Sequence, residues 1–367
     1  MKILFITNHL NTGGITSYVL TLAVGLKRRG HDVYIASSGG ELAFRLQEEG
    51  IAYIPIPIRT KKEINPKIIF CGFKLSAIIK REKIGIVHSH SRTTQLLGCF
   101  LQELTGVRHI FTCHGFFKRR LLRRLFPCWG DKVIAISEQV KEHLVRDFKL
   151  DEKRIAVVHN GIDIDRFGSR KAEDRRQIRQ KLGLGEGPVI GIIARLSDVK
   201  GHKYLIEAMQ PVLESYPSAR LLVVGTGKMQ GELERLSASL GIAKSVFFIP
   251  EVRDTPGALA ALDIFVMPSL QEGLGLALME AMAGGLAVIG SNVGGIRTLI
   301  RHGYNGLLVE PADSNALARA VILLLNDPAK RQELGREAQS FIRENFSQDK
   351  MVLETEKEYL SCLDAKN

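Results

Sequence analysis

The chain has 367 residues, of which 45% are hydrophobic, and it carries a formal net charge of +12. This length and composition fit more than one globular domain and exclude a disordered or collagen-like chain. The five cysteines have no metal-ligand or C-x-x-C spacing, which indicates a reduced, cytoplasmic protein without structural zinc. The most apolar long stretch, residues 274–289, is too short to cross a bilayer and contains Glu280, so we expect a chain that is soluble or at most attached to a membrane surface.

The first half of the chain alternates between short apolar strands and amphipathic helices. A strand at Lys2–Thr7 leads through Gly13-Gly14 into a helix at Ser17–Arg29. Further strands are predicted at His31–Ala36, Gly85–His88, His109–Thr112, Lys132–Ile136 and Ile155–His159. This alternation predicts a parallel, doubly wound sheet.

The polar stretch from Arg166 to Gly187 has no strand signal, and we predict a linker there that contains a short helix. The alternation then restarts, with strands predicted at Pro188–Ala194, Arg220–Val224, Ser245–Ile249, Ile264–Met267, Ala287–Gly290 and Gly306–Val309. The expected fold class is therefore α/β, with two Rossmann-like domains whose parallel sheets face across a cleft. We assign residues 1–168 to the N-terminal domain and 169–346 to the C-terminal domain. We predict a last helix in residues 347–367. Its sequence pattern does not indicate which domain it packs on, and we provisionally assign it to the first domain.

The strongest motif, residues 268–285, follows a predicted strand. Gly273 and Gly275 permit a tight turn against a ligand, and a helix that begins there directs free N–H groups at an anion such as a diphosphate. Glu272 precedes the turn and can accept hydrogen bonds from sugar hydroxyls. Glu280 lies two helical turns further on among apolar and small residues, where it needs partners such as ribose hydroxyls. The alternative is an ordinary helix with two ordinary glutamates.

A second motif places Arg195 at the end of a strand and Lys200 at the start of the next helix. Two cations at this position can hold a diphosphate and stabilise the charge on a leaving phosphate, and two surface cations are the alternative. Gly13-Gly14 and Gly225 lie at strand-to-helix turns and give weaker phosphate-binding signals, because a tight turn explains them equally well.

Three histidines lie near predicted strand ends: His88, His90 and His114. His88-x-His90 is compatible with a metal site, but no third ligand is evident and we expect no metal. His114 precedes a glycine and is placed to hydrogen-bond a sugar, with a structural histidine as the alternative.

All the excess positive charge lies in residues 1–168, which hold 27 Lys and Arg against 15 Asp and Glu, whereas residues 169–367 hold 24 of each. One interpretation is unevenly distributed solubilising charge. The other is a surface for an anionic membrane, a phosphorylated acceptor or nucleic acid. The run Lys118–Trp129 interleaves basic residues with Leu121 and Leu125, four residues apart and following Phe117. This spacing is typical of a basic interfacial helix, and a helix docked on its own sheet is the alternative.

In chain order these motifs resemble family 4 of the retaining glycosyltransferases, which have the GT-B fold. The matching strings are Gly13-Gly14, His114-Gly115, residues 160–163, Arg195 to Lys200 and the pair Glu272 and Glu280. The resemblance implies that Gly14 lies against the donor phosphates, His114 contacts the transferred sugar, Arg195 and Lys200 bind the diphosphate, Glu272 binds sugar hydroxyls and Glu280 binds the ribose. The resemblance also implies that the remaining residues of the donor-binding site are Gly13, Gly225, Gly273, Leu274, Gly275 and Leu276. Two positions depart from the family pattern: Leu274 stands where many members carry phenylalanine, and residues 250–254 stand where Gly-x-x often stands. Both departures could alter the enzyme's preference for the base or for the donor.

The expected function is transfer of a hexosyl or N-acetylhexosaminyl group, with retention of configuration and without a metal or cofactor. The expected donor is a nucleotide diphosphate sugar, UDP rather than GDP, and the acceptor is a lipid-linked or cell-envelope glycan, as in lipopolysaccharide or polysaccharide synthesis. The first domain would bind the acceptor and the second the donor. A peripheral site on the inner face of the cell membrane, through Lys118–Trp129, stays an open alternative to a purely cytoplasmic protein.

Two rival functions are a nucleotide-sugar epimerase and a non-catalytic protein that binds nucleic acid or nucleotide sugars. The complete set of charged residues at the expected donor site disfavours the epimerase. The chain carries no recognisable nucleic-acid motif, and we expect no nucleic-acid partner.

Overall fold

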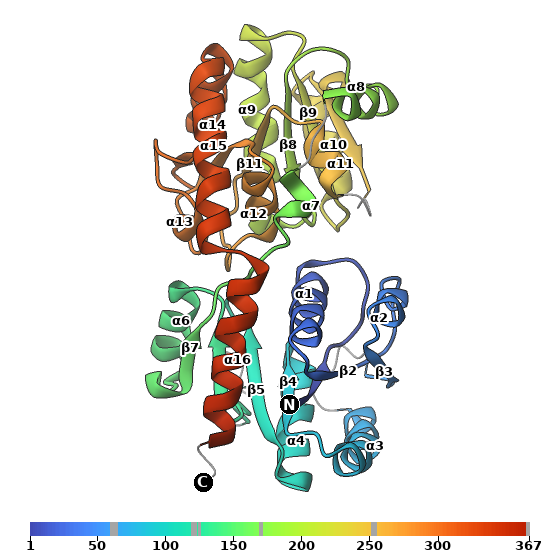
Figure 1. Cartoon of the computed structure of the whole chain (residues 1–367). Helices are drawn as coiled ribbons and strands as arrows, with labels where there is room; N and C mark the ends of the chain where they lie inside the picture. The colour runs from blue at the N-terminus through green and yellow to red at the C-terminus, as the bar shows by residue number, and fades with distance from the viewer. Residues whose placement is uncertain (59–64, 119–122, 124–125, 169–171, 251–254, 365–367) are drawn as a thin grey trace. The chain divides into compact units, whose positions relative to one another are not determined.

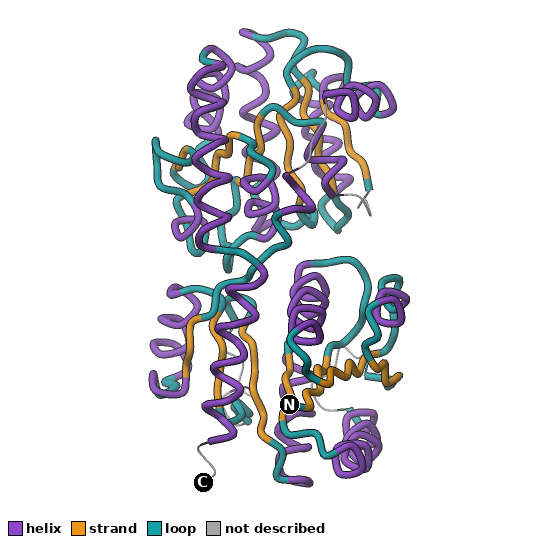
Figure 2. Tube along the Cα trace, in the orientation of Figure 1, coloured by secondary structure: helices purple, strands orange, loops and turns teal. Residues whose placement is uncertain are grey.

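The computed structural model describes residues 1–58, 65–118, 123, 126–168, 172–250 and 255–364. The chain forms two compact units (Figure 1). Unit 1 comprises Met1–Gly161 and Gln348–Asn367, and unit 2 comprises Ile162–Ser347. Each unit is an α/β layer structure around one parallel sheet, as the sequence predicted (Figure 2).

Unit 1 is built on a seven-stranded parallel sheet with the order β3-β2-β1-β4-β5-β6-β7. Its strands are β1 Lys2–Ile6, β2 Asp32–Ser37, β3 Ala52–Pro55, β4 Ile86–Ser89, β5 Arg108–Cys113, β6 Lys132–Ala135 and β7 Ile155–Val157. Its helices are α1 Gly14–Arg28, α2 Phe44–Glu48, α3 Pro66–Glu82, α4 Arg92–Thr105, α6 Glu138–Phe148 and α16 Gln348–Asp364. Strand β3, at the sheet edge, was not predicted from the sequence.

The alternation of side chains along β1 explains why both faces of this sheet are covered. Ile3 and Phe5 point into a core shared with α1 and α16, whereas Leu4 and Ile6 point into a separate core shared with α3 and α4. All four side chains are fully buried. Continuous apolar strands of this kind are typical of a parallel sheet with helices on both faces.

The C-terminal helix α16 packs on unit 1, against α1. The contact is close because α1 has a glycine in its C-terminal part: a Cβ atom at Gly25 would lie 2.3 Å from Val352 Cγ2. Glu356 on α16 also binds Arg29 at 2.7 Å and His31 at 2.6 Å. These contacts tie the end of the chain to the first helix of the same unit.

Unit 2 is built on a six-stranded parallel sheet with the order β10-β9-β8-β11-β12-β13. Its strands are β8 Val189–Ile193, β9 Arg220–Val224, β10 Val246–Ile249, β11 Ile264–Met267, β12 Ala287–Ser291 and β13 Leu307–Val309. Its α-helices are α7 Asp165–Gly168, α8 Ala172–Lys181, α9 His202–Ser215, α10 Gln230–Ser239, α11 Thr255–Ala260, α12 Leu276–Ala283, α13 Ile296–Leu299, α14 Ser314–Asn326 and α15 Pro328–Asn345.

Helix α8 lies in the stretch that we predicted as a linker, but it is docked on unit 2. Arg179 is only 9% exposed, and it donates hydrogen bonds to the Ala261 carbonyl at 2.8 Å and to the Asp263 carboxylate at 2.6 Å. A buried arginine bound to a strand-end aspartate fixes the helix to the sheet. The division between the units falls at Gly161/Ile162, a few residues before the expected boundary at 168/169.

Candidate functional site

The loops that follow β8 and β11 lie at the same edge of the unit 2 sheet, because these strands pair in parallel. The Leu270 N–H donates to the Val199 carbonyl at 2.8 Å, which joins the two loops. A Cβ atom at Gly201 would lie 1.9 Å from the Pro268 carbonyl oxygen, so only glycine permits this approach. The loop that carries Lys200 is therefore packed directly on the loop that carries Glu272.

Lys200 and Glu272 form an ion pair, with 2.5 Å between Nζ and Oε2. Their side chains are 21% and 12% exposed, and the Ser269 hydroxyl lies 3.4 Å from the same carboxylate oxygen. Because the pair is partly shielded from water, removal of one partner leaves the other charge poorly compensated. The structure thus joins a predicted phosphate-binding cation to a predicted sugar-binding carboxylate.

Two glycines that the sequence analysis did not single out position the backbone of Glu272. The Gly295 N–H donates to the Glu272 carbonyl at 3.0 Å. Cβ atoms at Gly294 and Gly295 would lie 2.2 Å from the carbonyl oxygen of Glu272 and 2.1 Å from that of Gly273. The paired glycines just after the predicted strand Ala287–Gly290 are the sequence signal for this contact.

Helix α12 begins at Leu276, after Gly275, whose φ of 99° lies in the left-handed region. No side chain caps this helix start, so its first N–H groups are available to an anion. The Leu274 side chain is only 1% exposed and packs into the unit, so a change at this residue acts on the core before it acts on a ligand.

Glu280 lies on α12 and is partly buried. Its carboxylate accepts no hydrogen bond from any residue that the structure describes. Burial raises the pKa of Glu280 to about 7, and the positive charge of Arg166 lowers it in part. A partly buried carboxylate without hydrogen bonds is unfavourable unless a ligand supplies donors.

Arg195 follows β8 at the same sheet edge, but its side chain is exposed. Among the described residues it makes no ion pair, so it is not part of the contact between Lys200 and Glu272. Gly225 follows the neighbouring strand β9, and a Cβ atom there would lie 2.2 Å from the Ala194 carbonyl oxygen. This close approach to the Arg195 loop accounts for Gly225 without a ligand.

The remaining predicted site residues, Gly13, Gly14 and His114, lie in unit 1. Gly13 and Gly14 are exposed at the start of α1, which no side chain caps, and nothing lies within 4 Å of a Cβ atom placed at Gly13. This helix start is open to an anion in the same way as that of α12.

The His114 ring is held by two neighbours. Its Nε2 lies 3.2 Å from His90 Nδ1, and its ring stands edge-on to Tyr18 with 4.8 Å between centroids. Burial lowers the pKa of His114 to about 3, so the imidazole is neutral near pH 7. A neutral, oriented imidazole can form a hydrogen bond to a ligand through Nδ1, but it carries no proton to donate as imidazolium.

His88 is a structural residue. Its Nδ1 lies 2.6 Å from the Tyr359 hydroxyl, and its Nε2 lies 2.6 Å from Thr112 Oγ1. The side chain is fully buried. Because both ring nitrogens are engaged, the alternative of a metal site at His88-x-His90 has no support in this geometry.

The basic run Lys118–Trp129 is described only in part, since residues 119–122 and 124–125 lie outside the described residues. Phe117 stacks on Phe111 with 6.1 Å between ring centroids. Arg123 is 7% exposed, and its guanidinium lies 3.9 Å from the centre of the Phe117 ring. These two side chains therefore point into unit 1, whereas Phe126 of the same run is 55% exposed.

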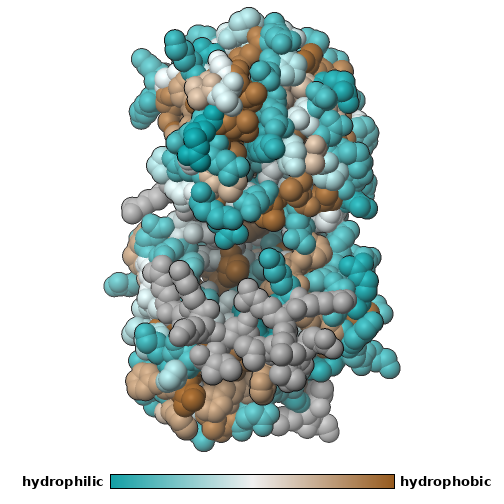
Figure 3. Space-filling view, turned by 180° about the vertical axis from the view of Figure 1, so that it is seen from behind, coloured by the Kyte–Doolittle hydropathy of each residue, from teal (hydrophilic) through white to brown (hydrophobic). Residues whose placement is uncertain are grey.

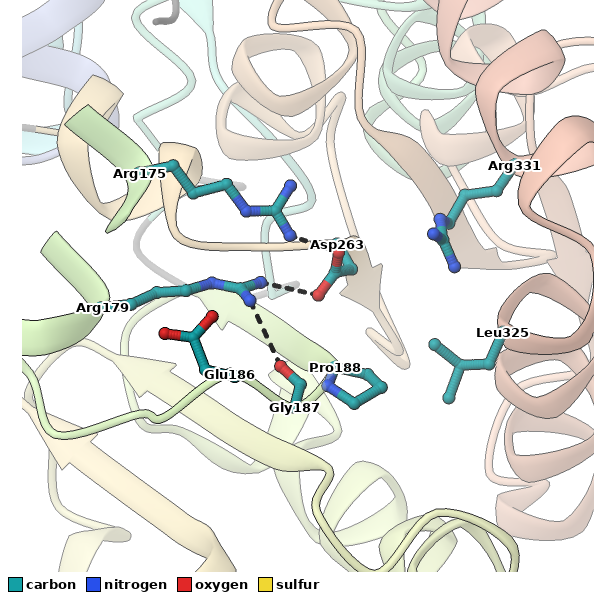
Figure 4. A pocket seen from close by; sticks show the side chains of 8 residues that line it. All are labelled: Arg175, Arg179, Glu186, Gly187, Pro188, Asp263, Leu325 and Arg331. Atoms are coloured by element: carbon teal, nitrogen blue, oxygen red, sulfur yellow. Dashed lines mark hydrogen bonds and ion pairs between the residues drawn. The ribbon is translucent and has the colours of Figure 1, made fainter. Parts of the chain in front are cut away.

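A cavity of about 250 Å³ lies at the opposite, amino edge of the unit 2 sheet (Figure 4). Asp263, just before β11, forms ion pairs with Arg175 and Arg179 on one side of the cavity, while Arg331 and Leu325 line the other side. Asp263 also accepts a hydrogen bond from the Val189 N–H at 2.8 Å. These mutual contacts anchor α8, and the cavity is remote from the strand ends that carry Lys200 and Glu272.

Two family models match the chain: Glycosyltransferase Family 4 at residues 12–166 and Glycosyl transferases group 1 at residues 174–341. The chain is 30% identical to the UDP-Gal:alpha-D-GlcNAc-diphosphoundecaprenol alpha-1,3-galactosyltransferase of Escherichia coli over 69% of each chain. It is 32% identical to the D-inositol 3-phosphate glycosyltransferase of Streptomyces scabiei, over 96% of this chain and 87% of that protein. The structure of Anabaena HepE superposes with a TM-score of 0.87 at 23% identity, covering 98% of this chain and 99% of HepE.

These matches agree with the two parallel sheets and with the order of the motifs along the chain. Among the described residues, no helix has the length and apolar character to span a membrane.

The matches to the family models and to the relatives show that the chain belongs to glycosyltransferase family 4, has the GT-B fold and is a glycosyltransferase.

Proposed function

We propose that the protein transfers a hexosyl or N-acetylhexosaminyl group from a UDP-sugar to a lipid-linked acceptor, with retention of anomeric configuration. The observation that carries the donor assignment is the cluster at the carboxyl edge of the unit 2 sheet. There, the Lys200–Glu272 ion pair lies between two loops of one sheet edge, and Glu280 presents a carboxylate that accepts no hydrogen bond from the described residues.

The diphosphate of the donor would take Lys200 as a counter-ion, together with the exposed Arg195 and the open N–H groups of α12. Lys200 is already neutralised by Glu272, so donor binding redistributes an existing ion pair and buries no new lone charge. Glu272 then becomes available to the hydroxyls of the sugar. The ribose hydroxyls would donate to Glu280 and satisfy its carboxylate.

In the reaction we propose, the acceptor hydroxyl oxygen forms a bond to the anomeric carbon on the face from which the diphosphate departs. The bond between that carbon and the phosphate oxygen breaks, and the hydroxyl proton passes to the leaving phosphate oxygen. Lys200 and Arg195 stabilise the charge that develops on the diphosphate. His114, neutral because its pKa is about 3, would accept or donate a hydrogen bond to the transferred sugar and would not act as an acid.

The acceptor assignment rests on the relatives and on charge. The E. coli relative is named for a diphosphoundecaprenol acceptor, and the whole excess of positive charge lies in residues 1–168. The Streptomyces relative is named for D-inositol 3-phosphate, so a phosphorylated small acceptor is the second candidate. Both acceptors present phosphate to a basic unit 1.

A thermal-shift screen with UDP, GDP and UDP-sugars tests the donor, because a ligand at 100 times its dissociation constant stabilises the fold by about 2.7 kcal/mol. We expect UDP and one UDP-sugar to raise the melting temperature and GDP to leave it unchanged. NMR of the product anomeric proton then tests retention. Inversion, or stabilisation by GDP alone, contradicts the proposal.

Metal independence is part of the same proposal. It is tested by measuring turnover in excess EDTA, with Mn²⁺ or Mg²⁺ added back. We expect the rate to be unchanged by the chelator, since cationic side chains and helix N–H groups supply the positive charge. Loss of activity in EDTA that a divalent metal restores would show that the mechanism stated above is wrong.

A further inference from the structure

Helix α3 of unit 1 exposes large apolar side chains to solvent. Ile69, Phe70 and Phe73 are 55%, 61% and 59% exposed. Together with the exposed Ala77 they occupy successive turns of one helix face. In Figure 3, tan and brown side chains gather at the lower left of the view, where this face lies. Contiguous apolar surface of this kind on a soluble protein marks an interaction site.

The exposure of these residues does not arise from a loosely attached helix. The other side of α3 is buried in the unit 1 core through Ile68, Cys71, Leu75 and Ile79. At its start, the Asn65 side chain accepts a hydrogen bond from the Lys67 N–H at 2.9 Å. The apolar face is therefore presented by a capped, firmly docked helix.

Basic residues border this face. Lys67, Lys74 and Arg81 follow one another at intervals of seven residues, and so form a row along the helix beside the apolar row. Lys80 adds a further positive charge at the C-terminal end. The single acidic residue of the helix, Glu82, is paired with Arg81 at 2.8 Å.

We propose that α3 is a membrane-docking helix, which inserts Ile69, Phe70 and Phe73 among the headgroups of an anionic bilayer while its lysines contact lipid phosphates. Adjacent apolar and basic rows are the pattern of helices that lie in the membrane interface. Charge complementarity selects this occupant over a second copy of the chain, because two such faces would bring two basic rows together. The inference goes beyond the proposed reaction, since vesicle binding requires no turnover.

This assignment adds α3 to the membrane contact that the sequence predicts at Lys118–Trp129. In that run, the described side chain of Arg123 is buried against Phe117, whereas Phe126 is 55% exposed. The residues of α3 that we assign to the interface are exposed, and they belong to the half of the chain that carries the entire +12 excess.

Co-sedimentation with vesicles tests the apolar row. We expect the full chain to bind vesicles of phosphatidylglycerol and phosphatidylcholine at low salt, and not vesicles of phosphatidylcholine alone. Phe70→Ser with Phe73→Ser should lower the partition coefficient at least tenfold. The matched control is Phe44→Ser, which removes a phenylalanine on α2 that is 57% exposed in the same unit and should change nothing.

The basic row is tested with Lys67→Gln and Lys80→Gln, compared with Arg28→Gln and Lys153→Gln, which remove two exposed charges elsewhere in unit 1. We expect the α3 pair to weaken binding about tenfold or more, since each basic residue near an anionic surface contributes about 1 kcal/mol. The control pair should have a much smaller effect. Equal losses in both pairs would mean that only net charge matters, and would overturn the assignment to α3.

A direct readout uses Phe70→Trp, because the chain has one tryptophan, Trp129, which is only 6% exposed. Brominated lipids should quench the emission added by Phe70→Trp and not that added by Phe44→Trp. Binding without quenching at residue 70, or no binding at low salt, overturns the proposal. The UDP-induced thermal shift should persist in the Phe70→Ser, Phe73→Ser variant, so failure of the donor assignment and failure of this inference remain distinguishable.

Discussion

The Tyr359 hydroxyl lies 2.6 Å from Nδ1 of His88, so the last helix of the chain is hydrogen-bonded to the centre of the first sheet. Both side chains are fully buried. The other His88 nitrogen is bound to Thr112 on β5, which continues the connection across the sheet. A hydrogen-bonded chain through three elements of one unit fixes their relative positions without any ligand.

Replacement of Tyr359 by phenylalanine should destabilise unit 1 by about 1–3 kcal/mol, because it leaves the buried His88 Nδ1 without a partner while it keeps the ring. Urea unfolding followed by circular dichroism measures the change. Leu360→Ala, at a neighbouring residue that is 47% exposed, is the control and should cost less than about 0.5 kcal/mol. An unchanged unfolding midpoint in Tyr359→Phe would show that the bond contributes nothing.

Unit 1 should be sensitive to mild acid. Burial lowers the pKa of His88 and His90 well below the usual value, that of His109 to about 4 and that of His114 to about 3. Below pH 6.5 these histidines bind protons in the unfolded chain but not in the native unit, so the free energy of unfolding falls as the pH falls. Each histidine contributes up to about 1.4 kcal/mol per pH unit.

The measurement for this prediction is the free energy of unfolding between pH 7 and pH 5, compared between the protein and His109→Asn. The free energy of unfolding of the variant should depend less steeply on pH, by the slope that corresponds to about one bound proton. Identical slopes would mean that His109 titrates in the native state as it does in the unfolded chain.

Lys200→Ala should lower the turnover number about 10²-fold, as expected when a preorganised charge partner of the leaving group is lost. Arg195→Ala should act in the same direction. Lys203→Ala is the matched control, because this lysine lies on α9, is 58% exposed and should leave the rate unchanged. Melting temperatures confirm folding, and near-normal rates in both Lys200→Ala and Arg195→Ala would exclude a phosphate clamp.

A double-mutant cycle refines this test. If Lys200 acts on the donor through its contact with Glu272, the losses in Lys200→Ala and Glu272→Gln should be less than additive in the double variant. Full additivity would indicate that the two side chains act on the ligand independently, despite the 2.5 Å contact between them.

Glu280→Gln should stabilise the free protein and weaken UDP binding. The native pKa is raised to about 7 from 4.5, so the native state holds a proton that the unfolded chain has lost, and stability declines as the pH rises from 4.5 to 7. At pH 8 the glutamine variant avoids this loss, which amounts to at most about 3 kcal/mol. Its melting temperature should exceed that of the parent at pH 8, and calorimetry should show weaker UDP binding.

The two measurements answer different questions. A variant that is more stable and still binds UDP normally would show that Glu280 is an unfavourable buried carboxylate with no ribose contact. A variant with lower stability at pH 8 would contradict the raised pKa itself.

The strands were predictable because a buried parallel strand is a short apolar run between polar turns. Arg220–Val224 and Ile264–Met267 agree with the structure to the residue. Strand β3, Ala52–Pro55, escaped prediction because it is a short edge strand that ends in proline and has an exposed alanine. An edge strand is covered less than a central one, and so its sequence shows less apolar character.

The candidate site was predictable as a set of residues but not as a set of contacts. Lys200 and Glu272 are 72 residues apart, and their pairing depends on the strand order of the sheet and on Gly201 and Gly294, where glycine permits close backbone approach. The burial of Arg179 was equally hidden, because a buried arginine and a surface arginine look the same in a charged helix. Only the position of Asp263 distinguishes them.

The return of α16 to unit 1 has a consequence for biosynthesis. Unit 2, Ile162–Ser347, is one continuous segment, whereas unit 1 needs both Met1–Gly161 and the helix that begins at Gln348. During translation the second unit can finish folding while the first still lacks Tyr359, Val352 and Met351 from its core. The amino-terminal unit should therefore be the later of the two to mature, with its apolar α1 surface open to chaperones until α16 emerges.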